Sequence, residues 1–124
     1  MEGMKIIEIA AKALDSKKAQ DIKAMHITDL TILSDYFLIA SGGSTTQVKA
    51  LAEEVEHRLS QAGVEPGHIE GRSTSWILLD YGTAVIHVFL KDAREFYDLE
   101  KLWVDAEPVD LSAYLDINEE SVPE

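Results

Sequence analysis

The chain of 124 residues contains no cysteine. This absence excludes disulfide bonds, thiolate zinc sites and cysteine nucleophiles, and it is consistent with a reducing compartment. No apolar run approaches the roughly 20 residues that a membrane-spanning helix needs, and the N-terminus shows no basic segment followed by an apolar core. We therefore expect a cytoplasmic protein.

Positive charge is scarce, because 11 lysines and arginines stand against 23 aspartates and glutamates, for a net charge of -12. The imbalance is greatest from Asp92 to the end, where eleven acidic residues accompany only Arg94 and Lys101. Direct binding to a phosphate backbone depends on clustered lysine and arginine, so nucleic acid should be repelled. The charge favours a basic protein partner, although it could also serve solubility alone.

Internal repeats are absent as well, and the length fits one domain with one core. Apolar residues at helical spacing predict three helices, over 4–16, from Ser44 to Gly63, and from Asp92 to Pro108, the second and third opening with capping-box spacing. In the third helix the predicted apolar stripe consists of Phe96, Leu99, Leu102 and Trp103.

Strand-like stretches lie between the predicted helices, over 21–28, 36–40, 68–72 and on both sides of 82–83. The order of elements predicts a single-domain α/β fold in which helices pack on a mixed β-sheet, with the strand order left open. We expect this domain to cover residues 1–106. The acidic residues 107–124 carry only scattered apolar side chains and are predicted to form a loosely ordered C-terminal tail.

The stretch WILLDYGTAVIHVFL, residues 76–90, predicts a hairpin with a two-residue turn at Gly82 and Thr83. Counting outward from this turn assigns the side chains to two faces. One face, suited to a core beneath helices, carries Ile77, Leu79, Tyr81, Ala84, Ile86 and Val88. The other carries Trp76, Leu78, Asp80, Val85, His87 and Phe89.

The second face of the hairpin allows two interpretations. Asp80 would need a partner in a dry core, whereas aromatic anchors among polar groups are typical of protein interfaces. Alternatively, the first or third helix covers this face and Asp80 caps a turn.

A possible phosphate-binding turn, Gly42-Gly43-Ser44, follows the apolar strand over 36–40. A nucleotidyltransferase also needs a pair of carboxylates to hold Mg²⁺, and Glu70 and Asp80 are isolated acids in separate segments. Glu53 and His57 could share a metal, but no second histidine has matching spacing. We therefore predict no catalytic residue, metal or cofactor, and no enzymatic activity.

Several motifs together resemble the ribosomal silencing factor family, also called Iojap-like proteins. They occur in the family's order and extend over most of residues 4–106. They are residues 35–44 (DYFLIASGGS), the Gln47-Val48 opening of the second helix, Glu70-Gly71, 76–82 (WILLDYG), 85–89 (VIHVF) and 94–103 (REFYDLEKLW).

The resemblance implies a fold related to the nucleotidyltransferases but without their catalytic carboxylates. It also implies a translational repressor that binds a protein on the intersubunit face of the large ribosomal subunit. Occupying this face would sterically block the joining of the small subunit when nutrients are scarce. Neither a cofactor nor a membrane is implied. Alternatives are a nucleotide-binding or residual nucleotidyltransferase-type module using Ser41–Ser44, and a homodimer formed through an exposed sheet edge.

The resemblance also directs attention to the second face of the hairpin as the partner-binding site. On this hypothesis Trp76 and Leu78 are the anchors, Phe89 and His87 extend the patch, and Asp80 and Glu70 meet basic groups of the ribosomal protein. Four further signature residues are expected to serve core packing and a fixing ion pair, namely Arg94, Tyr97, Glu100 and Trp103.

Overall fold

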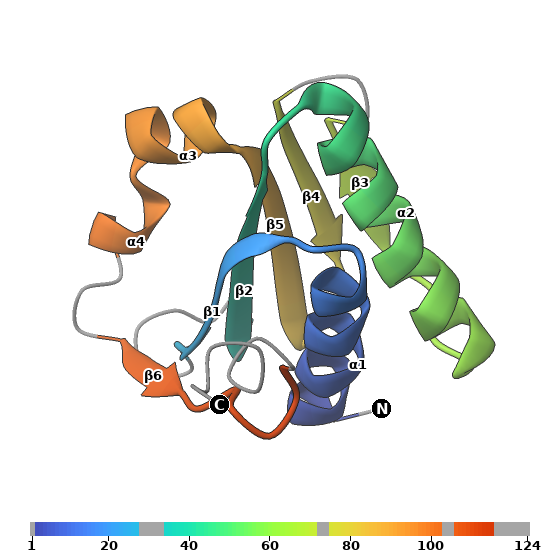
Figure 1. Ribbon diagram of the computed structural model, residues 1–124. Helices are drawn as coiled ribbons and strands as arrows, with labels where there is room; N and C mark the ends of the chain where they lie inside the picture. The colour runs from blue at the N-terminus through green and yellow to red at the C-terminus, as the bar shows by residue number, and fades with distance from the viewer. Residues whose placement is uncertain (1, 28–33, 72–74, 103–105, 116–124) are drawn as a thin grey trace, which may run out of the picture.

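The computed structural model describes residues 2–27, 34–71, 75–102 and 106–115. They form a single α/β domain, as the order of sequence patterns predicts (Figure 1). Its elements are α1 (Gly3–Ser16), β1 (Gln20–His26), β2 (Tyr36–Gly42), α2 (Thr45–Gln61), β3 (His68–Glu70), β4 (Trp76–Asp80), β5 (Ala84–Leu90), α3 (Lys91–Tyr97), α4 (Leu99–Leu102) and β6 (Glu107–Val109).

The six strands form one mixed sheet in the order β3-β4-β5-β2-β1-β6. β2 and β5 run parallel, and the other neighbouring strands pair antiparallel. α1 and α2 cover one face of the sheet, whereas α3 lies on the other side (Figure 1). None of the helices within the described ranges is both long and apolar enough to traverse a bilayer.

The predicted second helix is confirmed as α2. The Ser44 hydroxyl accepts a hydrogen bond from the Gln47 amide at 3.1 Å, and Gln47 Oε1 accepts one from the Gly43 amide at 2.7 Å. Gly63 follows the helix with a φ of +87°, a conformation that glycine adopts without strain. The apolar stripe of α2 is buried against the sheet and α1 through Val48, Leu51, Ala52, Val55 and Leu59.

The hairpin register also agrees with the prediction at every pair, because Trp76 lies opposite Phe89, Leu78 opposite His87 and Asp80 opposite Val85. Gly82 has a φ of +85°, and the amide of Tyr81 donates to the carbonyl of Ala84 at 2.9 Å. On the face beneath α1 and α2, the buried hairpin residues are Ile77, Leu79, Ala84, Ile86 and Val88.

The predicted third helix is shorter than expected and is broken. α3 begins directly after Leu90, and no side chain caps it, so the predicted cap at Asp92 is wrong. Asp98 adopts a left-handed conformation with a φ of 48°, which ends α3 before the short α4 begins. Phe96, predicted to be apolar core, is 81% exposed. Trp103 lies outside the described residues.

The first part of the acidic C-terminal segment is attached to the sheet, which corrects the expectation for residues 107–115. β6 pairs antiparallel with β1, and Leu111 is buried with 6% exposure. Val109, Tyr114 and Leu115 pack against the same core, so a few spaced apolar side chains are enough to hold this segment. Residues 116–124 lie outside the described part of the chain.

Candidate functional site

An aromatic cluster lies where the second face of the hairpin meets α3. We define it as Trp76, His87, Phe89, Phe96 and Tyr97. The indole of Trp76 stacks on Phe89 with ring centroids 4.9 Å apart and contacts the ring of Tyr97 at 5.0 Å. Phe96 packs edge-to-face on Tyr97 at 5.1 Å. β4, β5 and α3 therefore contribute to one continuous set of rings.

Exposure rises steadily through the aromatic cluster. Phe89 is fully buried and His87 is 3% exposed, whereas Trp76 is half-buried, Tyr97 is 50% exposed and Phe96 is 81% exposed. Among the described residues, Phe96 and Tyr97 are the large hydrophobic side chains that remain exposed. The cluster thus has a buried base on β5 and an exposed rim on α3.

The buried base exists because the chain enters α3 immediately after β5 and packs back over Phe89. A second small core forms there from Met25, Ile27, Ile39 and Phe89, with Trp76, Ala93 and Leu99 partly buried against it. Phe89 and His87 lie within the predicted patch but below its surface. They can support Trp76, but they have almost no area to offer a partner.

Phe96 and Tyr97 are rim residues that the sequence does not predict as part of the site. Its helical pattern places Phe96 on the apolar stripe that faces the core, and Tyr97 is expected to serve core packing. Adjacent helical residues lie about 100° apart around the axis, since a turn contains 3.6 residues. Two consecutive aromatics in a short helix therefore cannot both point directly at the core, and this adjacency was the available signal.

The polar residues predicted for the site lie on the same face, in rows that cross neighbouring strands. Glu70 on β3 pairs with Leu78 on β4, which in turn pairs with His87 on β5. Leu78 is half-buried and Glu70 is exposed, with Glu70 Oε2 at 2.6 Å from His68 Nε2. The structure thus places Glu70 and Leu78 in one row with His87, at the edge of the aromatic cluster.

Asp80 has a structural role within the hairpin. Its Oδ1 accepts a hydrogen bond of 2.8 Å from the amide of Gly82, so the carboxylate caps the turn, as one of the two interpretations of this face required. The side chain is half-buried on β4, in the row next to Leu78. Its second oxygen gives the site a negative charge near the turn.

His87 has an unusual environment for an ionisable group. Its Nδ1 accepts a hydrogen bond of 3.1 Å from the indole Nε1 of Trp76, and its ring lies 4.7 Å from the ring of Phe37. Burial lowers the pKa of His87 to about 4, because a charged imidazolium would lose its hydration there. His87 is therefore neutral at physiological pH.

Arg94 holds α3 and α4 against the sheet, which confirms the predicted fixing ion pair. The guanidinium is buried and donates to Glu100 Oε1 at 3.0 Å, to the carbonyl of Asp21 at 2.6 Å and to the hydroxyl of Ser41 at 2.8 Å. The hydrogen bond from Arg94 is the main cause that lowers the pKa of Glu100. Arg94 thus fixes the exposed rim from below.

Some donors at and after the Ser41–Ser44 turn are already engaged within the chain. The amides of Gly43 and Gln47 are hydrogen-bonded within the chain, and Gln47 Nε2 donates to the carbonyls of Lys17 and Lys18 at 3.4 and 3.3 Å. In the described ranges, no three histidine or acidic side chains come together as metal ligands. The Gly43 amide is therefore already engaged by the Gln47 side chain rather than open to a phosphate.

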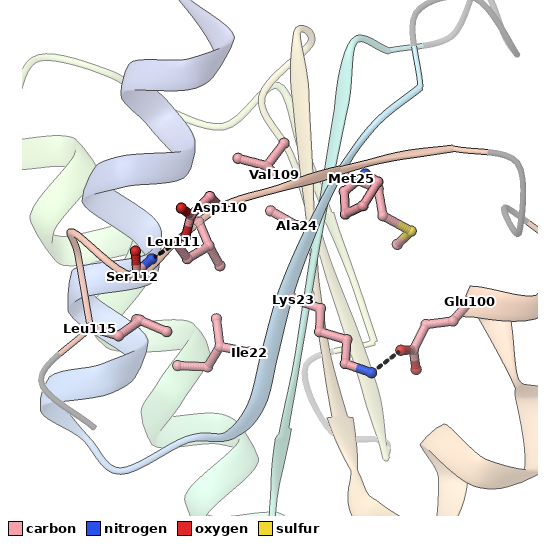
Figure 2. Close-up of a pocket in the computed structure, with 11 residues that line it drawn as sticks. Ile22, Lys23, Ala24, Met25, Glu100, Val109, Asp110, Leu111, Ser112 and Leu115 are labelled. Carbon is pink, nitrogen blue, oxygen red and sulfur yellow. Dashed lines mark hydrogen bonds and ion pairs between the residues drawn. The ribbon is translucent and has the colours of Figure 1, made fainter. Parts of the chain in front are cut away.

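A separate groove of about 550 Å³ lies between β1, β6 and the segment that follows β6 (Figure 2). Its walls are mainly apolar, and Lys23 approaches Glu100 to 3.4 Å at one side. Apolar lining residues include Ile22, Ala24, Met25, Val109, Leu111 and Leu115. None of the six residues predicted to bind a partner lines this groove.

Comparison with known sequences gives consistent matches over nearly the whole chain. A family profile described as "Ribosomal silencing factor during starvation" matches residues 2–123. A ribosomal silencing factor from Bacillus subtilis is 43% identical over 112 residues, which cover 90% of this chain and 95% of that protein. The mouse protein named "Mitochondrial assembly of ribosomal large subunit protein 1" is 33% identical over 78% of this chain and 44% of its own length.

A solved structure agrees with these matches. The crystal structure of a Chromobacterium violaceum protein superposes with a TM-score of 0.80 at 41% identity and covers 83% of this chain and 87% of that chain. Profile, sequence and structure therefore agree over the same α/β domain. The chain belongs to the ribosomal silencing factor family.

Proposed function

We propose that this protein is a non-enzymatic translational repressor that acts in the cytoplasm. It binds a protein on the intersubunit face of the large ribosomal subunit and sterically blocks the joining of the small subunit. The observation that carries this proposal is an exposed aromatic rim on a strongly acidic protein of the ribosomal silencing factor family. Occupancy alone produces the effect, so no turnover and no cofactor are needed.

The aromatic rim has the properties of a binding hot spot. Hot spots are enriched in tryptophan and tyrosine, and they are strongest where the anchor is already held in its bound orientation. Trp76 rests on the buried Phe89 and is flanked by Tyr97, so its ring is largely ordered before binding. Phe96 adds exposed apolar area beside it, and Leu78 extends the surface along β4.

The charge around the rim favours a basic partner. Glu70 and Asp80 lie on the hairpin side, and Asp92, Glu95 and Asp98 are exposed on or next to α3. Together with the net charge of -12, these groups would accelerate encounter with a positively charged protein and repel bare nucleic acid. The name of the mouse relative, which refers to the large ribosomal subunit, supports that subunit as the target.

Co-sedimentation with separated ribosomal subunits tests the proposal. We expect the wild-type protein to sediment with large subunits only and to reduce the fraction of joined particles. Trp76→Ala should weaken binding by about 2 kcal/mol or more, which is roughly 30-fold. Tyr114→Ala is the matched control, because it removes a partly buried ring that packs against the core beneath α1 and should leave binding unchanged.

Different results would refute the proposed function and the proposed binding site. Wild-type protein that binds neither subunit, or both equally, would refute anti-association through the large subunit. Unchanged affinity of a folded Trp76→Ala variant would refute the aromatic cluster as the binding site, without contradicting the proposed function. Thermal melts of both variants separate loss of binding from loss of fold.

A further inference from the structure

The hydrogen bond between Trp76 and His87 links the exposed surface to a buried polar group. The indole N–H is a donor only, so His87 Nδ1 must be the acceptor in this 3.1 Å contact. We propose that His87 is a positioning residue, which fixes the indole of Trp76 in one orientation for a protein partner by accepting its N–H hydrogen bond. This inference rests on the proposed function, in which Trp76 is an anchor.

The tautomer that the hydrogen bond requires comes at a cost. With Nδ1 accepting, the neutral ring carries its proton on Nε2, and this atom is buried without a hydrogen-bond partner in the described part of the chain. A buried unsatisfied donor is destabilising, and an apolar side chain of similar size between Phe37 and Phe89 would avoid it. The bond to Trp76 supplies a reason for an imidazole here.

The aromatic neighbours of Trp76 do not by themselves select one orientation. Stacking on Phe89 and contact with Tyr97 restrict the plane of the indole, but a ring turned over about its χ2 torsion can stack in much the same plane. The two edges of the indole differ, because one of them carries the N–H group. An acceptor beneath that edge therefore distinguishes the two orientations.

The acceptor is available throughout the physiological range. Because burial keeps His87 neutral, Nδ1 retains its lone pair at any pH at which ribosomes function. The ring itself is 3% exposed and has almost no surface to offer a partner. Its effect on binding must consequently pass through Trp76.

Two substitutions of His87 test this role. His87→Leu keeps an apolar volume and removes the acceptor, and we expect it to weaken binding to large subunits roughly threefold to tenfold, the usual effect of one net hydrogen bond. His87→Asn places Oδ1 near the former position of Nδ1 and should restore most of that affinity. In a Trp76→Phe background, which has no indole N–H, both substitutions should change binding less than about twofold.

Nuclear magnetic resonance gives a readout that does not depend on ribosomes. In the ¹⁵N-labelled wild-type protein, we expect His87 in the Nε2-protonated tautomer. The indole N–H signal of Trp76, assigned by its loss in Trp76→Phe, should move in His87→Leu and return toward its wild-type position in His87→Asn. This measurement on the wild-type protein remains decisive if His87→Leu does not fold.

Several results would overturn the inference. They are an Nδ1-protonated His87, a folded His87→Leu variant with wild-type affinity, or an equal loss of affinity in the Trp76 and Trp76→Phe backgrounds. Failure of the proposed function is distinguishable, because the wild-type protein would then not bind large subunits while the resonance measurements still report on the hydrogen bond.

Discussion

The two phenylalanines of the aromatic cluster provide the sharpest separation of binding from folding. Phe96 is 81% exposed and Phe89 is fully buried, although both belong to the same set of rings. Truncating Phe96 to alanine should change the free energy of unfolding by no more than about 0.5 kcal/mol, as is usual for an exposed side chain. If the rim is a hot spot, the same change should weaken binding to large subunits by about 2 kcal/mol, roughly 30-fold.

Phe89→Ala should show the opposite balance. Removing a fully buried phenylalanine typically costs about 3 to 5 kcal/mol of stability, since it combines lost burial with a cavity. The cavity would open beneath the indole of Trp76, which stacks on Phe89 at 4.9 Å. Binding should therefore weaken as well, but only together with a large loss of stability.

Urea denaturation and titration of separated large subunits measure the two effects in parallel. We expect Phe96→Ala to lose affinity for large subunits at unchanged stability, and Phe89→Ala to lose stability. Wild-type affinity of Phe96→Ala would show that α3 takes no part in binding. A stable Phe89→Ala variant would show that the base of the cluster contributes little to the fold.

Two further predictions concern buried ionisable groups. Arg94→Met should lower the free energy of unfolding by about 3 to 5 kcal/mol in urea denaturation, because it removes a buried guanidinium from Glu100, the Asp21 carbonyl and Ser41. A loss of stability below about 1 kcal/mol would contradict the role of Arg94 in holding α3 and α4 against the sheet. For His87, the folded state has a pKa of about 4 against an ordinary value of 6.5, so the unfolded chain binds more protons between these values and stability rises with pH across this window. Across this window the free energy of unfolding should rise by about 3 kcal/mol, and this rise should be absent from the pH dependence of His87→Phe. An unchanged pH dependence in the variant would show that other groups cause the rise.

The features that could be predicted from the sequence are local ones. A two-residue turn at Gly82 fixes the pairing of the hairpin by counting, so each cross-strand pair from Trp76 to Asp80 was predictable. The cap of α2 was equally local, since Ser44 and Gln47 are three residues apart. The assignment of side chains to the two faces of β4 and β5 followed from the strand period alone.

The features that could not be predicted depend on distant partners. Arg94 is held by the carbonyl of Asp21, 73 residues earlier, and by Ser41, 53 residues earlier. These bonds and the left-handed Asp98 decide where α3 ends and which way it faces. The adjacency of Phe96 and Tyr97 indicates only that both rings cannot point at the core, and no helical pattern within residues 92–107 shows which way α3 faces.

The second face of the hairpin is both covered and exposed, so neither interpretation of the sequence was complete. α3 packs over Phe89, and in doing so it presents Phe96 and Tyr97 to solvent beside Trp76. The exposed aromatic surface is therefore created by the covering helix rather than left by its absence. A partner docking there would contact α3 and β4 together, and its binding would depend on the angle of α3. Arg94 holds α3 from beneath without being accessible, so under the proposed function its ion pair with Glu100 would support recognition as well as folding.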